Sequence, residues 1–238
     1  MKAAVIIPVF NEGERVLAVA EAAQNCSNIR EVVVVNDGST DKTASILRGL
    51  DLTVLTHHIN KGKGEALDTG VRYARGVGYD KVVFLDGDLR GIQPKHIDDL
   101  LAPIEEDDTY MTIGYLGLRK AFVKKIILNK WGALSGQRAI RTEVWDLLNN
   151  QDKHGFNIEA ALNARLRKNN LHRTIARVAL DGVGHVGKRY KEGSWSKAML
   201  AYTKTYGAAM RTYARIEFEK STLAVPETED SSLATGQP

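Results

Sequence analysis

Two aspartates separated by a single glycine, Asp86 and Asp88, directly follow the apolar run Val82–Leu85. Carboxylates this close repel each other, and burial at the end of a strand raises the cost of their charge. A divalent cation such as Mg²⁺ or Mn²⁺ would cancel that repulsion, because hard cations favour carboxylate oxygens. Gly87 would let a ligand or a second backbone approach closely. The motif therefore predicts either a metal site or a solvated Asp-Gly turn.

Two further polar motifs could bind parts of an anionic ligand. In NDGSTD (Asn36–Asp41), Asp37 could accept hydrogen bonds from a base or a ribose, or it could belong to a turn before a helix. In NKGKGEAL (Asn60–Leu67), backbone amides with Lys61 or Lys63 could meet an anion at a helix N-terminus. The second motif lacks the spacing of a phosphate-binding P-loop, so we reject that interpretation.

Three motifs in the second half carry residues that could ligate, bind or accept a proton. His185 lies in GVGHVG (Gly182–Gly187) and is either a loop histidine or a metal ligand. No further strand follows GVGHVG, so we do not interpret its glycine spacing as a dinucleotide site. Arg138 in LSGQR suits a phosphate or carboxylate, or is a solvated residue at a helix start. Glu159 in GFNIE is either a general base or an acid that stabilises a first helical turn.

The elements that must position these residues alternate between short apolar strands and helical patterns. Strands are predicted at Ala3–Val9, Glu31–Val35, Leu52–Leu55 and Lys81–Leu85. Near-continuous apolar strands alternating with helices predict an α/β fold, in which helices cover both faces of a mostly parallel sheet. Ligands bind such sheets beyond the carboxyl ends of the strands, where PVFNE (Pro8–Glu12) and the aspartate motifs would share one rim.

The second half is less regular than the first. We expect an edge strand at Thr109–Leu116, helices at Thr142–Asn150 and Asn157–Lys168, a strand at Leu171–Leu180 and a long helix at Ser194–Lys220. These elements predict a domain over residues 1–190, a C-terminal helical extension over 191–220 and a disordered acidic tail over 221–238.

Composition excludes several classes of protein. The chain has 238 residues, 43% hydrophobic and 26% charged, which is ordinary for a globular domain. Its single cysteine, Cys26, rules out an intrachain disulfide and agrees with a reducing cytoplasm. The formal net charge is +4 although the tail is acidic, and a basic body suits an anionic substrate or surface. Basic residues without aromatic interleaving argue against nucleic-acid binding.

The order of the motifs is more specific than any one of them. PVFNE, VNDGSTD, NKGKGEAL, FLDGDL, LSGQR and GFNIE, in this order over about residues 1–185, resemble the family-2 glycosyltransferases with the GT-A fold. The combination is nearest to the polyprenyl-phosphate sugar transferases, such as dolichyl-phosphate mannose synthase. It is also similar to the transferases that glucosylate phosphoglycerate, which use a later histidine at the metal.

This resemblance implies roles on the donor side. A nucleotide-sugar donor would bind residues of the first four motifs. These are Pro8, Asn11, Glu12, Asp37, Lys63, Asp86, Gly87 and Asp88. Asp88, with Asp86 and His185, would hold Mg²⁺ or Mn²⁺ on the donor diphosphate. Gln137 and the Arg90-Gly91 pair depart from the residues expected in the lipid-phosphate enzymes.

The same resemblance implies the acceptor side and the reaction. Ser135, Gly136 and Arg138 would hold the acceptor or the donor phosphate, and Glu159, which takes the position of the acidic residue near the acceptor, would be catalytic. The expected activity is transfer of a hexose to a phosphate-bearing acceptor such as polyprenyl phosphate, with inversion. A retaining glucosyl-phosphoglycerate synthase and a nucleotidyltransferase are the alternatives. We expect a cytoplasmic protein, whose basic segment 119–130 could lie on the inner face of a membrane, or form a solvated helix face or a flexible acceptor loop.

Overall fold

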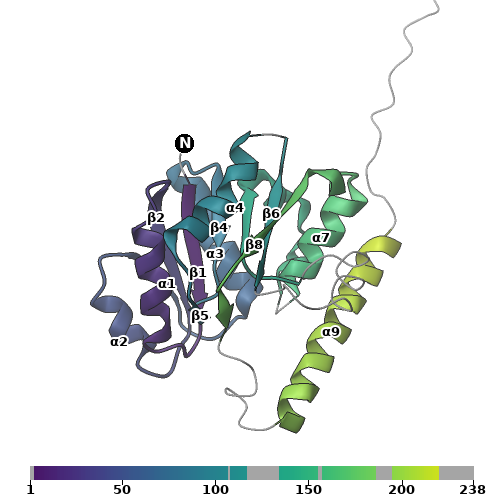
Figure 1. Ribbon diagram of the computed structural model, residues 1–238. Coiled ribbons are helices and arrows are strands. Elements are labelled where there is room, and N and C mark those ends of the chain that lie inside the picture. The colour runs from purple at the N-terminus through teal and green to yellow at the C-terminus, as the bar shows by residue number, and fades with distance from the viewer. Residues whose placement is uncertain (1–2, 107, 117–133, 155–156, 186–194, 220–238) are drawn as a thin grey trace, which may run out of the picture.

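A computed structural model describes residues 3–106, 108–116, 134–154, 157–185 and 195–219. Its centre is a seven-stranded sheet in the order β3-β2-β1-β4-β7-β6-β8 (Figure 1). The strands are β1 (Ala3–Val9), β2 (Ile29–Asp37), β3 (Thr53–His57), β4 (Lys81–Phe84), β6 (Met111–Leu116), β7 (Arg138–Arg141) and β8 (Ile175–Leu180). β1 to β4 are parallel, β7 runs antiparallel to β4 and β6, and β6 is parallel to β8. The mostly parallel sheet predicted from the sequence is confirmed.

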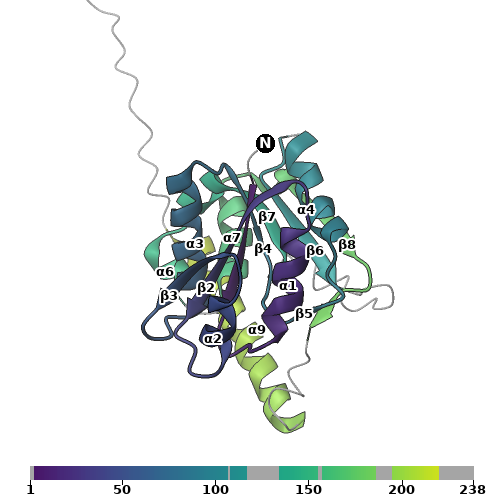
Figure 2. The same ribbon diagram turned by 90° about the vertical axis from the view of Figure 1, so that its left-hand side faces the viewer.

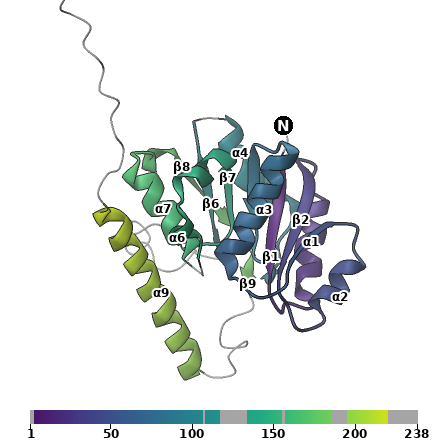
Figure 3. The ribbon, with the colours of Figure 1, turned by 180° about the vertical axis from the view of Figure 1, so that it is seen from behind.

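Helices cover both faces of this sheet. They are α1 (Arg15–Gln24), α2 (Thr43–Arg48), α3 (Lys63–Val77), α4 (Pro94–Glu106), α6 (Asn150–Lys153), α7 (Ile158–Lys168) and α9 (Trp195–Phe218). α1 and α4 lie in front of the sheet in Figure 1, whereas α3 and α6 lie on the side that Figure 3 shows, and α9 packs against α7. Two 3₁₀ turns, Thr142–Leu147 and His172–Thr174, complete the described helical structure.

Alternate residues of the central strands supply two separate cores. In β1, Ala4 and Ile6 pack with the side chains of α3 and α7, whereas Val5 and Ile7 pack with those of α1 and α4. Each strand is therefore apolar on both faces, which explains the unbroken apolar runs in the sequence. The four strands predicted in the first half are present, with ends shifted by a residue or two.

Two predictions for the second half are wrong. β6 is not an edge strand, because it pairs with both β7 and β8, and β3 and β8 form the edges. The alternation of polar and apolar residues suggested that one face of the strand is exposed, but Thr112, a polar residue, is fully buried. The helix predicted over Thr142–Asn150 is a 3₁₀ turn that ends at Leu147. A new helix, α6, then begins after a capping box between Asn149 and Asp152.

The C-terminal helix belongs to the sheet domain in its packing. Ala209, Tyr213 and Ile216 of α9 are buried in the same core as α7. The domain boundary predicted at residue 190 lies outside the described residues, as do the basic segment 119–130 and the tail 221–238. Within the described ranges, no helix combines the length and the apolar character needed to cross a membrane.

Candidate active site

The aspartate motif directly follows β4 (labelled in Figure 2) and lies beside the carboxyl end of β1. Gly87 allows this approach, because a Cβ there would lie 2.7 Å from Val9 Cγ1 and 3.4 Å from the Pro8 carbonyl oxygen. Strand β5 (Leu89–Arg90) follows the motif and pairs with β9 (Gly184–His185) in a small second sheet. Leu89 is opposite His185 in this pairing, so backbone hydrogen bonding between β5 and β9 places the histidine next to the aspartates.

Asp86, Asp88 and His185 form a cluster that fits a divalent metal. Each offers one ligand atom, and these atoms lie within 4.8 Å of one another. His185 Nδ1 is 3.9 Å from Asp88 Oδ1. Asp86 and Asp88 are half-buried and His185 is exposed, so the cluster is open toward solvent. Two carboxylates and an imidazole suit Mg²⁺ or Mn²⁺. The structure thus brings together the three residues predicted as metal ligands.

Lys63, the first residue of α3, joins this cluster to Glu159. Its ammonium donates a 2.6 Å hydrogen bond to Asp86 Oδ1 and another of 2.6 Å to Glu159 Oε1. Burial opposes the charge on Lys63, but the two carboxylates outweigh it and raise the pKa of Lys63 above its usual range. Glu159 lies in the first turn of α7, so the contact joins elements 96 positions apart.

The SGQR motif packs against this ion pair with its small and amide residues. Gly136 is close enough that a Cβ would lie 2.5 Å from Lys63 Nζ and 2.6 Å from both Asp86 carboxylate oxygens. Gln137 Nε2 donates to Asp86 Oδ2 over 2.8 Å, and Ser135 Oγ donates to Gln137 Oε1 over 3.0 Å. Sequence reasoning noted Gln137 only as a departure from the related enzymes and missed this contact.

Arg138 occupies a different place from the one expected of an acceptor ligand. Its side chain is buried, with the residue 1% exposed, because β7 lies inside the sheet and the guanidinium fits between β6 and α7. Nη1 donates to Asn163 Oδ1 over 2.7 Å, and Nε donates to the Ser135 carbonyl over 2.7 Å. Burial lowers the pKa of Arg138, and the charge of Glu159 opposes that shift. In this conformation the Arg138 side chain lies in the interior, where it contacts Ser135 and Asn163.

Asp37 is likewise engaged inside the protein. Its carboxylate accepts hydrogen bonds from the backbone amides of Lys61 and Gly62, over 2.9 and 2.8 Å, and from His57 Nδ1 over 2.7 Å. His57 Nε2 in turn contacts Thr69 Oγ1 of α3 over 2.9 Å. Asp37 therefore anchors the glycine-spaced loop that leads into Lys63. His57, which the motif analysis did not select, completes this anchor.

The loops after β1 and β2 are joined to each other at the same rim. Asn11 has a left-handed backbone with φ of 55°, and its Oδ1 accepts a 2.8 Å hydrogen bond from the Thr40 amide. The Asn11 amide donates to Ser39 Oγ over 3.0 Å. Glu12 accepts a 2.7 Å hydrogen bond from Arg15 Nε. Pro8, Asn11 and Glu12, predicted to bind the donor, thus lie at the sheet edge that carries the candidate metal cluster.

The family follows from comparison of the whole sequence with known families. The family model for glycosyl transferase family 2 matches residues 4–166, which is more than half of the chain. The chain belongs to that family. The matched range includes every predicted site residue except His185.

Curated relatives match part of the chain. A dodecaprenyl-phosphate galacturonate synthase of Rhizobium johnstonii is 30% identical over 138 residues, covering 53% of this chain and 40% of the relative. A UDP-N-acetylglucosamine–dolichyl-phosphate N-acetylglucosaminyltransferase of Methanococcus voltae is 29% identical over 126 residues, covering 46% and 49%. The chain thus spans about half the length of the curated relatives that it matches, or less.

Solved structures confirm the fold over almost the whole chain. Glucosyl-3-phosphoglycerate synthase from Mycobacterium tuberculosis, crystallised with Mn²⁺, UDP and glucosyl-3-phosphoglycerate, superposes with a TM-score of 0.73. The superposition covers 92% of this chain and 81% of that one at 22% sequence identity. At this identity the likeness establishes the shared GT-A architecture, which the motif order predicted.

Proposed function

We propose that this protein transfers a hexose from a nucleotide-sugar donor to a phosphate-bearing acceptor, with Mg²⁺ or Mn²⁺ at the cluster of Asp86, Asp88 and His185. The cluster itself carries the proposal, because it sets three metal-binding side chains at the sheet edge where parallel α/β sheets bind ligands. Membership of glycosyl transferase family 2 supports the reaction class.

The residues present suit a metal bound to a diphosphate. Asp88 and His185 would be its ligands together with Asp86, whose oxygens also accept hydrogen bonds from Lys63 and Gln137. When bound, such a cation would stabilise the negative charge that develops on the departing nucleotide. Lys63 adds positive charge beside the cluster. Because Gly87 has no side chain, the motif packs closely against the end of β1.

The acceptor is proposed from both chemistry and relatives. An acceptor hydroxyl must lose its proton to a base, whereas an acceptor phosphate is already an anion. Glu159 is bonded to Lys63, an arrangement in keeping with an acceptor that needs no strong base. The relatives named above use dodecaprenyl and dolichyl phosphate, so polyprenyl phosphate is the acceptor we propose. Contact with a membrane through segment 119–130 would follow from a lipid acceptor.

Transfer with a set of donors tests the proposal. Purified protein with Mn²⁺ is incubated with UDP- and GDP-sugars and a short-chain polyprenyl phosphate, and product is measured. Asp88→Ala should reduce the rate by at least about 100-fold, since it removes a charged metal ligand. Asp99→Ala, which changes a carboxylate paired with Lys95 on α4, should keep the wild-type rate. An Asp88→Ala variant as active as wild type would contradict the metal assignment.

The same assay separates the alternatives. From a nucleotide sugar, a glycosyltransferase releases a nucleoside phosphate, whereas a nucleotidyltransferase releases pyrophosphate only when it is supplied instead with a nucleoside triphosphate and a sugar phosphate. Transfer to phosphoglycerate but not to polyprenyl phosphate would overturn the proposed acceptor. Nuclear magnetic resonance of the product gives the anomeric configuration, and we expect inversion. A retained configuration would favour the phosphoglycerate type of transferase instead.

A further inference from the structure

Lys63 places one ammonium between two carboxylates from opposite sides of the site. Asp86 belongs to the metal cluster at the end of β4, and Glu159 begins α7. Asp86 Oδ1 and Glu159 Oε1 each lie 2.6 Å from Lys63 Nζ. The three side chains are 16%, 21% and 12% exposed for Lys63, Asp86 and Glu159. In so enclosed a place, charge interactions are stronger than at an open surface.

The surroundings hold Lys63 in this bridging position. Asp37 fixes the backbone of Lys61 and Gly62, the two residues before it. Gly136 leaves no spare room on the other side, since a Cβ there would collide with Lys63 Nζ. Gln137 holds the second oxygen of Asp86. The ammonium of Lys63 is therefore held in place on one side by its own loop and on the other side by the SGQR motif.

A donor diphosphate would bring new negative charge to the same place. Asp86, which Lys63 contacts, offers a ligand atom to the cluster proposed to hold the metal and the diphosphate. A diphosphate there and Glu159 would both attract the single ammonium of Lys63. Charged phosphate oxygens are strong acceptors for such a donor.

We propose that Glu159 and the donor diphosphate compete for Lys63, which acts as a positioning residue between the donor and acceptor sides. This inference rests on the proposed function. Glu159 weakens donor binding by holding Lys63, and donor binding in turn releases Glu159 toward the acceptor. The side chain that faces the acceptor is thereby coupled to occupancy of the donor site through Lys63, 96 positions earlier in the chain.

Calorimetry with UDP or GDP in the presence of Mn²⁺ tests the competition. Glu159→Gln keeps the shape of the side chain and removes its charge. This variant should bind the nucleotide about fivefold more tightly than wild type. Lys63→Met should bind it more weakly. In the Lys63→Met background, adding Glu159→Gln should produce no gain, because the gain acts through Lys63.

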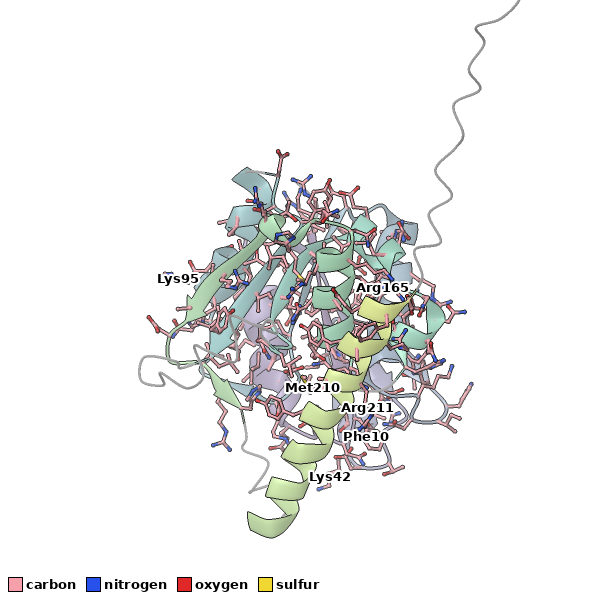
Figure 4. All side chains as sticks on the ribbon, turned by 90° about the vertical axis from the view of Figure 1, so that its right-hand side faces the viewer. Phe10, Lys42, Lys95, Arg165, Met210 and Arg211 are labelled. Carbon is pink, nitrogen blue, oxygen red and sulfur yellow. The ribbon has the colours of Figure 1, made fainter. Side chains whose placement is uncertain are left out.

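Two results would overturn the competition. One is a Glu159→Gln variant with unchanged or weaker nucleotide affinity. The other is an equal gain from Glu159→Gln in both backgrounds, which would indicate a general charge effect without Lys63. Should Lys63→Met fail to fold, Lys63→Arg keeps the charge, and the gain from Glu159→Gln must then persist. Lys95→Met, on the outer face of α4 (Figure 4), is the matched lysine control and should bind as wild type does.

Failure of the proposed function has a different signature. A wild-type protein that binds neither UDP nor GDP with Mn²⁺ contradicts the proposed donor, whatever Lys63 does. Thermal unfolding without ligand then still measures the shared ion pair. Lys63→Met should lower the melting temperature, and Glu159→Gln should restore part of that loss by removing an unpaired carboxylate. Additive effects of the two changes would overturn the coupling.

Discussion

Three consecutive residues of the SGQR motif show how position decides the role of a side chain. Gly136 borders the Lys63–Asp86 pair, Gln137 donates to Asp86, and Arg138 points into the interior toward Asn163. Alternation along an extended chain explains this, since neighbouring side chains point to opposite faces. The charged member of the motif therefore points away from Asp86, and Gly136 and Gln137 lie against that carboxylate.

Gly136→Ala tests whether the space that Gly136 leaves beside the Lys63–Asp86 pair is needed, because it adds one methyl group there. The new Cβ would lie within 2.6 Å of Lys63 Nζ and of both Asp86 oxygens, so those side-chain ends must shift. We expect at least about tenfold weaker binding of Mn²⁺ with nucleotide, and about 1–2 kcal/mol lower stability. Titration calorimetry and urea unfolding measure the two effects.

Gly76→Ala is the matched control, because a Cβ at Gly76 of α3 meets no atom within 4 Å. It should leave binding unchanged and raise stability slightly, since alanine favours a helix more than glycine does. Wild-type nucleotide affinity in Gly136→Ala would show that the space beside the ion pair is not needed.

At the scale of elements, α7 is held in place by α6 and α9. Asp152 of α6 is buried and accepts hydrogen bonds from Arg165 of α7, over 2.7 Å, and from Arg215 of α9. Glu219, just after α9, accepts a 2.6 Å hydrogen bond from Arg165 (labelled in Figure 4) and one of 2.8 Å from Arg215. Because α7 begins with Ile158 and Glu159, this network helps to fix the carboxylate that contacts Lys63.

Asp152→Asn should therefore cost about 3 kcal/mol in the free energy of unfolding, because it removes the buried negative charge that pairs with two partly buried arginines. Asp146→Asn is the control: this residue pairs with Arg75, but its side chain is 60% exposed, so its loss should cost less than about 1 kcal/mol. Urea unfolding at neutral pH measures both changes. Equal stabilities of the two variants would contradict the importance of the buried network.

The same variant has a pH signature. Burial opposes the charge on Asp152, but hydrogen bonds from Arg165 and Arg215 outweigh it and hold the pKa of Asp152 below its usual value. A carboxyl group with a lowered folded-state pKa stabilises the protein above its unfolded pKa of about 4, and that stability is lost as the pH falls through the folded value. The stability difference between wild type and Asp152→Asn should accordingly shrink below about pH 4. A difference that stays constant to lower pH would contradict this assignment.

At the scale of the whole molecule, the proposed metal site lies at the rim and the cores lie elsewhere. Asp86, Asp88 and His185 are half-buried or exposed, whereas the two apolar cores lie on the two faces of the sheet. A metal at this rim would not be needed for folding. It would stabilise the folded protein only by mass action.

Removal of divalent metal should therefore abolish nucleotide binding without unfolding the protein. With a chelator, we expect the melting temperature of the ligand-free protein to change by less than about 2 °C. Mn²⁺ with nucleotide should raise it by several degrees, and the chelator should reverse that rise. A large loss of stability on chelation alone would show that the metal belongs to the structural core. Scanning fluorimetry is sufficient for all three conditions.

Local patterns in the sequence were enough to predict the parallel half of the sheet and the rim that carries the motifs. Apolar runs such as Ala3–Val9 are long enough to specify buried strands, and the carboxyl ends of parallel strands meet at one edge. The same patterns predicted β6 as a strand but placed it wrongly at the sheet edge, because a polar residue in it is buried. They also predicted a helix at the 3₁₀ turn that begins at Thr142, where a capping box starts a separate helix instead.

The sequence by itself determined which residue types reach the rim: two aspartates after β4, a glycine-spaced loop with Lys63, and a glutamate at the start of α7. Only the tertiary structure decided their partners. Pairing of β5 with β9 brought His185 to Asp88, α7 brought Glu159 to Lys63, and the interior position of β7 buried Arg138. Strand and helix formation depends on neighbours along the chain, whereas these contacts join residues many positions apart and depend on how the finished elements pack.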